Sequence, residues 1–189
     1  MSSAIFDDAG GGLPPLEKLT VLELGWASIT DESLLVLHKF KNLERLELAG
    51  CRRITSISHD WAAKFERLKE LNLNWIQLDS SKIEGLSSLP DLQVLSLMQS
   101  NIALEDLPFL PTLRVVRIDS KKQPVSTLFP YPTLPEGLRL ETSDGLFSDD
   151  ERDLLYKHYP NLTIVELEPS TGKDKNEEEW SPILKSWDR

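Results

Sequence analysis

The chain of 189 residues has a single cysteine, Cys51, and no apolar run long enough to cross a membrane. A lone cysteine excludes an internal disulfide, which favours a reducing compartment, the cytoplasm or the nucleus. The first residues carry neither a basic run nor a long apolar stretch, so we expect no signal peptide. A spanning helix needs about 20 consecutive apolar residues, and we therefore expect no membrane among the partners.

Positive charge is also scarce. The chain has 21 lysine and arginine residues against 31 aspartate and glutamate residues, which gives a net charge of −10. Because an acidic field repels phosphate backbones, nucleic acid is not an expected partner. The same charge favours a chain that stays soluble and monomeric on its own.

The known sequence motifs of catalysis and metal binding are missing. The sequence contains no paired-cysteine motif, no HExxH, no phosphate-binding GxxxxGK[ST] and no GxSxG. Its three histidines, His38, His59 and His158, stand in separate segments of the chain. We therefore expect no enzymatic activity, no cofactor and no metal site.

A leucine-rich pattern returns about every 24 residues along most of the chain. In this frame the first core residues of the strands are Leu22, Leu46, Leu71, Leu95, Val116, Leu138 and Val165. The intervals between them are 24, 25, 24, 21, 22 and 27 residues. A fixed period of this size predicts a solenoid in which each repeat adds one short strand to a parallel sheet.

The segments between the expected strands differ from one repeat to the next. Thr30 or Asp31 is placed to begin a helix, and Ser148 with Glu151 forms a capping box that predicts another. The frame turns Cys51 inward, although Arg52 and Arg53 beside it would favour a reactive thiolate. We favour the structural role for Cys51.

The chain resembles the leucine-rich repeat superfamily over roughly residues 16 to 168, because residues 19–29, 68–78 and 92–102 fit LxxLxLxxNxL in their leucine frame. The repeat that contains Cys51 is similar to the cysteine-containing subtype common in F-box substrate receptors. No F-box-like segment is evident before the repeats. The resemblance implies an α/β fold, a right-handed solenoid of about seven parallel strands with short helices or extended segments on the convex face.

The pattern predicts three parts. Residues 1–15 are expected to form a flexible lead-in, residues 16–168 the repeat domain, and residues 169–189 a polar linker followed by a short helix. One face of that helix is apolar and consists of Trp180, Ile183, Leu184 and Trp187. Because so short a helix is marginal alone, it either covers the last repeat or binds a groove on a partner. We favour the cover.

The concave face of the sheet is the expected binding surface. Side chains alternate along a strand, so the residues that flank the inward leucines face solvent. Aromatic and methionine side chains are enriched in interface cores, and Trp75 and Met98 stand in these outward columns. The expected partner-binding residues are Glu47, Asn72, Asn74, Trp75, Met98, Arg117, Asp119 and Arg139.

Two arginines of this set fall side by side in the assigned frame. Like charges directly opposite destabilise a sheet, so Arg117 and Arg139 need a neutralising group. Either Asp119 and Glu141 supply it within the face, or an acidic group of a partner does. We favour neutralisation within the face.

The sequence thus predicts a non-enzymatic interaction module that binds a protein partner through its concave sheet. One alternative is substrate recognition within a ubiquitin ligase, which the Cys51 repeat suggests. Another is a regulatory or assembly subunit that contacts its partner through the C-terminal helix. The family hosts many unrelated functions, so the resemblance does not name the partner.

Overall fold

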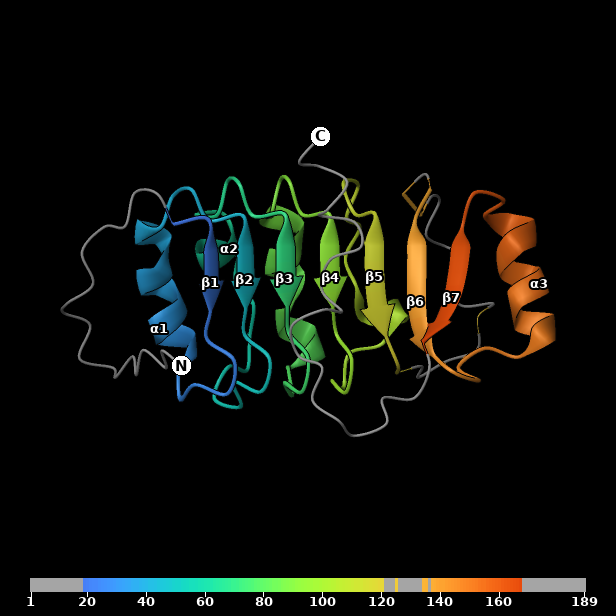
Figure 1. Cartoon of the computed structure of the whole chain (residues 1–189), viewed down its shortest axis with the longest axis horizontal. Coiled ribbons are helices and arrows are strands. Elements are labelled where there is room, and N and C mark those ends of the chain that lie inside the picture. Colours follow the sequence, from blue (N-terminus) through green and yellow to red (C-terminus); the bar gives the residue numbers. More distant parts are fainter. Residues whose placement is uncertain (1–18, 121–124, 126–133, 136, 168–189) are drawn as a thin grey trace.

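A computed structural model describes residues 19–120, 125, 134–135 and 137–167. These residues contain one sheet of seven parallel strands, whose order in the sheet follows the sequence (Figure 1). The strands are β1 (Val21–Glu23), β2 (Arg45–Glu47), β3 (Glu70–Asn72), β4 (Val94–Ser96), β5 (Val115–Ile118), β6 (Arg139–Ser143) and β7 (Thr163–Leu167). The expected α/β class with a parallel sheet is confirmed.

Short helical segments follow most of the strands, and in Figure 1 the first and last helices stand beside the two ends of the sheet. They are α1 (Asp31–Val36), η1 (Leu37–Lys39), α2 (His59–Ala62), η2 (Ser80–Lys82), η3 (Glu84–Ser88), η4 (Leu104–Asp106) and α3 (Asp149–His158). None of these described helices is both long and apolar enough to span a bilayer. The expected lead-in over residues 1–15, and the helix with Trp180, Ile183, Leu184 and Trp187, lie outside the described residues.

Both expected helix starts are confirmed. Thr30 caps α1, where its hydroxyl accepts from the Ser33 N–H and the Ser33 hydroxyl accepts from the Thr30 N–H. Ser148 and Glu151 make the same reciprocal pair at the start of α3. Such pairs satisfy backbone donors that have no partner inside the first turn of a helix.

The first inward residues of successive strands stack in register. They are Leu22, Leu46, Leu71, Leu95, Val116, Leu140 and Ile164. Leu71 and Leu95 are completely buried, as their place in adjacent strands predicts. The intervals become 24, 25, 24, 21, 24 and 24 residues, which is more regular than the frame taken from the sequence.

The last two strands correct that frame. Leu138 lies two residues before the first inward position of β6, and Val165 stands one residue beyond that of β7. The second positions of this column hold the buried Thr142 and the exposed Glu166, which are polar where the first four repeats have leucine. The frame predicted from the sequence followed the apolar residues that best fit a Leu-x-Leu pattern. It was therefore displaced in both strands.

Cys51 has the inward position that the sequence predicts. Its thiol is completely buried, and its Sγ donates a hydrogen bond to the Leu24 carbonyl oxygen at 3.1 Å. Burial raises the pKa of Cys51 to about 11, against hydrogen bonds from the backbone of Ala27 and Trp26. The side chain therefore joins the turn after β2 to the preceding repeat, which confirms the structural role.

The covered side of the sheet contains one very close backbone approach. Gly85, in η3, donates its N–H to the Ile57 carbonyl oxygen at 3.0 Å. A Cβ at position 85 would lie 2.3 Å from that oxygen and 2.4 Å from the Ser58 carbonyl carbon. Glycine at this position lets two successive connecting segments touch through their main chains.

Candidate functional site

The face of the sheet turned away from the helices is called the open face here. In Figure 1 the strands stand in front of α2, and no helix or strand that the structure describes crosses over them. Side chains that flank the inward column alternate to this face. Its polar members within the strands are Glu23, Arg45, Glu47, Glu70, Asn72, Ser96, Arg117, Arg139, Glu141, Ser143 and Thr163, and Asn74 and Asp119 follow β3 and β5.

A row of hydrogen bonds crosses the open face from β2 to the turn after β4. Asn72 donates from Nδ2 to Glu47 Oε2 at 2.5 Å and accepts from the Asn74 N–H at 2.9 Å. Asn74 Oδ1 in turn accepts from the Ser96 hydroxyl at 2.8 Å and from the Met98 N–H at 2.7 Å. These polar groups satisfy one another, so the row stiffens the surface.

Two carboxyl groups of the open face are poorly solvated. Burial raises the pKa of Glu47, opposed by hydrogen bonds from Asn72 and the Ala49 N–H and by Arg45, while nearby Glu23 raises it further. Burial also raises the pKa of Glu70, although Arg45, Arg117 and Lys69 lower it. The Arg45 Nε stands 3.7 Å from Glu70 Oε2.

The two arginines that were expected side by side are separated by a carboxylate. Arg117 pairs across the strands with Glu141, whereas Arg139 pairs with Val115. The Glu141 oxygens accept from Arg117 Nε at 2.5 Å and from Arg139 Nε at 2.7 Å. The prediction that a carboxylate within the face neutralises the arginines is therefore confirmed for Glu141. The prediction that the two arginines are direct neighbours is wrong, because the β6 frame was displaced.

Asp119 does not join this ion-pair cluster. Its carboxylate accepts from the Gln99 N–H at 2.9 Å and from the Gln99 side chain. It thereby ends a row that runs along the turns after the first four strands. In that row the N–H groups of Trp26, Gly50 and Trp75 donate to the carbonyl oxygens of Ala49, Asn74 and Met98.

The four residues of this turn row share a left-handed backbone. Their φ values are 63° at Trp26, 71° at Gly50, 61° at Trp75 and 57° at Gln99. Glycine adopts this conformation freely, but a bulky residue does so at a cost of about 1–3 kcal/mol. Two tryptophans are therefore held in a conformation that their side chains disfavour.

Both tryptophans are solvent-exposed, at 61% for Trp26 and 49% for Trp75. Their ring centroids are 6.4 Å apart and the ring planes are tilted by 39°. The Trp26 ring lies on the Gly50 backbone, where a Cβ would come within 2.4 Å of Trp26 Cε3. The result is one continuous aromatic surface at the ends of β1 to β3, which we call the tryptophan pair.

The expected partner-binding residues therefore fall into two groups. Trp75 is exposed and the Arg139 side chain is 44% exposed, while Met98 is half-buried. Arg139 is nevertheless engaged with Glu141, as the rest of the set is with the partners described above: Glu47, Asn72, Asn74, Arg117 and Asp119. Trp26 was not among the expected partner-binding residues, and the structure adds it to the exposed group. Glycine at position 50, between two tryptophans in the same column, is the signal for the pair.

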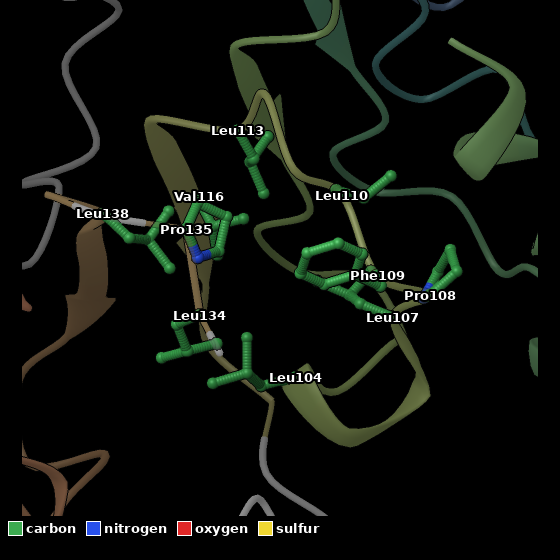
Figure 2. Close-up of a pocket in the computed structure, with 10 residues that line it drawn as sticks. All are labelled: Leu104, Leu107, Pro108, Phe109, Leu110, Leu113, Val116, Leu134, Pro135 and Leu138. Atoms are coloured by element: carbon green, nitrogen blue, oxygen red, sulfur yellow. The ribbon is translucent and has the colours of Figure 1, made fainter. Parts of the chain in front are cut away.

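An apolar pocket of about 40 Å³ lies near the connection between β4 and β5 (Figure 2). It is lined by Leu104, Leu107, Pro108, Phe109, Leu110, Leu113, Val116, Leu134, Pro135 and Leu138. Ligand sites need a few convergent polar groups to orient the ligand. The lining side chains that the structure describes offer none, so they give no group to orient a ligand.

The described residues contain no group of three or more histidine, cysteine, aspartate or glutamate side chains placed to hold a metal ion. The architecture defines an α/β protein built on a single parallel sheet with one open face. No protein-family model matches the chain, and a search of curated proteins gave no match.

Proposed function

We propose that the chain is a right-handed leucine-rich repeat solenoid, and that it acts as a non-enzymatic module that binds a protein partner through the open, concave face of its sheet. The observation that carries the binding proposal is the exposed tryptophan pair, Trp26 and Trp75, held at the end of that face.

The solenoid proposal is supported by the regular spacing of the inward residues. Five of the six intervals between them are 24 or 25 residues, within the range typical of leucine-rich repeats. Cys51 adds a second argument. Its hydrogen bond to Leu24 joins two turns, which is the work of asparagine or cysteine at this position of the repeat.

The binding proposal is supported by the rigidity of the exposed aromatic surface. Aromatic side chains are enriched in interface cores and among residues that dominate binding energies. The backbone N–H of each tryptophan is bonded to the next repeat, so the main chain that carries the rings is already ordered before binding. A positive φ at an exposed tryptophan is strain with no benefit to the core, which favours a role in recognition.

Photo-crosslinking in cells tests this proposal. A photo-crosslinking amino acid is placed at Val94 or Met98, two half-buried residues of the open face. The matched controls replace Phe109 and Tyr156, which are exposed outside that face at 51% and 41%. We expect the same protein to be cross-linked from both open-face positions and from neither control. Cross-links from the controls alone, or from no position, would contradict the proposal.

A further inference from the structure

The first three strands give the open face an acidic end. Glu23 and Glu47 are direct partners across β1 and β2, where like charges repel. Glu47 is fixed by Asn72 and the Ala49 N–H, whereas Glu23 is exposed and has no ion pair among the described residues. The only basic residue of these three strands, Arg45, faces the buried Glu70. Glu23 is thus left without an ion pair beside Glu47, whose charge is offset by its two hydrogen bonds and by Arg45 on the same strand.

The tryptophan pair lies at the same end of the sheet. Trp26 follows Glu23 by three residues and stands in the turn that directly follows β1, so the carboxylates and the rings share one end of the sheet. The Trp26 ring already has a cation beside it, since the Arg52 Cζ lies 5.7 Å from its centroid. That contact shows that a guanidinium fits against this aromatic surface. The Trp75 ring is half exposed, and no cation stacks on it among the described contacts.

We propose that this end of the open face binds a basic, extended segment of the partner protein. One arginine or lysine of the segment lies between Glu23 and Glu47, and a second one stacks on Trp75. The proposal rests on the proposed function, because it names the chemistry of the partner at that same face.

Charge complementarity favours a basic segment over an acidic or a purely apolar one. An acidic segment would face Glu23 and Glu47 and would add to a repulsion that is already present. A purely apolar segment would cover the tryptophans but would bury the two carboxylates without a counter-ion, which is unfavourable. A basic segment satisfies both features, because arginine pairs with carboxylates and also stacks on aromatic rings.

The test is a titration of the full-length protein with an eight-residue peptide that alternates arginine and glycine. A peptide of the same length that alternates glutamate and glycine is the control ligand. We expect the arginine peptide to bind and to shift the indole N–H resonances of Trp26 and Trp75, with no binding of the glutamate peptide. Glu23→Gln and Trp75→Gly should each raise Kd about tenfold, the range of a single strong interface contact.

Two variants control for charge and for folding. Glu32→Gln removes the same charge from the exposed first turn of α1 and should change Kd by less than about twofold. Trp75→Gly places glycine at a position of positive φ, so it should keep the cooperative unfolding transition of the wild type. Equal weakening by Glu32→Gln would reveal diffuse attraction and overturn the proposal. Absent binding of the arginine peptide, or tighter binding of the glutamate peptide, would overturn it as well.

The outcome is separable from that of the proposed function. A partner that cross-links at Val94 and Met98 but is insensitive to Glu23→Gln and Trp75→Gly would refute the basic segment and leave the open face as the binding surface. The absence of any cross-link to the open face would refute the proposed function directly.

Discussion

The two halves of the sheet keep the same backbone arrangement with different chemistry. In β1 to β4 the second inward position is always a buried leucine, and amide and carboxylate side chains form a row on the open face. In β6 and β7 the second inward residues are Thr142 and Glu166, and the open face of β5 and β6 is held by an arginine–glutamate cluster. Strand register is therefore maintained by the repeating main chain and does not require a repeating core.

The largest expected effect is on stability. It comes from the close approach of two connecting segments in the first half of the sheet, which the second half lacks at its matched glycine. Gly85→Ala should destabilise the protein by about 3 kcal/mol, because the new Cβ would meet the carbonyl of Ile57 and force the segments apart. The matched control is Gly145→Ala in the second half, where the Cβ meets nothing but φ is +71°. Its expected loss is about 1 kcal/mol. Urea denaturation measures both, and equal losses would contradict the close approach.

A second prediction concerns the ion-pair cluster of the second half. Arg117→Met should lower the free energy of unfolding by about 2 kcal/mol, because Glu141 is buried and would keep only Arg139. Lys69→Met is the control in the first half, since its pair with Glu44 is one-third exposed on both sides. That pair is expected to contribute less than about 1 kcal/mol. A larger loss from Lys69→Met than from Arg117→Met would reverse the comparison.

A third prediction concerns a substitution that makes the second inward position of β6 apolar, as it is in the first four repeats. The Thr142 hydroxyl is buried and has no hydrogen-bond partner among the described contacts. Thr142→Val keeps the shape of the side chain and removes that hydroxyl, so it should stabilise the protein by about 1 kcal/mol. Thr163→Val, at an exposed position of β7, should change stability little. Destabilisation by Thr142→Val would mean that the hydroxyl is satisfied by water.

The smallest expected effect is the pH dependence caused by Glu70. Because its folded pKa is raised, mainly by burial, its contribution to stability is fully present below the unfolded pKa and is lost as pH rises through the folded value. The free energy of unfolding of the wild type should therefore fall relative to that of Glu70→Gln between about pH 4 and pH 7. Urea denaturation of both proteins at about pH 4 and about pH 7 measures this difference. A difference that is constant or grows with pH would show that Arg45 and Arg117 outweigh burial.

Sequence reasoning gave the first four strands correctly because their inward positions are leucines at a constant spacing. The helix starts at Thr30 and Ser148 were also predictable, since capping depends only on residues within one turn. In β6 and β7 the apolar pattern and the repeat period disagree. The error arose from following the apolar residues Leu138 and Val165, where the period would have given Leu140 and Ile164.

The candidate surface was predicted less well than the fold. Outward columns identify which face a side chain occupies, but not whether a neighbour has already engaged it. Asn72 and Asp119 were expected to contact a partner, yet both are used in hydrogen bonds between repeats. The Trp26 ring on Gly50 depends on contact between adjacent turns 24 residues apart, and a single repeat read in isolation does not contain that information.

The link between Gln99 and Asp119 has an evolutionary consequence. The N–H groups of Trp26, Gly50 and Trp75 donate to main-chain oxygens, which every amino acid possesses, so replacing a side chain cannot remove those acceptors. At Gln99 the acceptor is the Asp119 carboxylate. In this row of turns, a single replacement of Asp119 during sequence drift can therefore remove the fourth hydrogen bond. The first three persist through side-chain replacements, because their acceptors belong to the backbone.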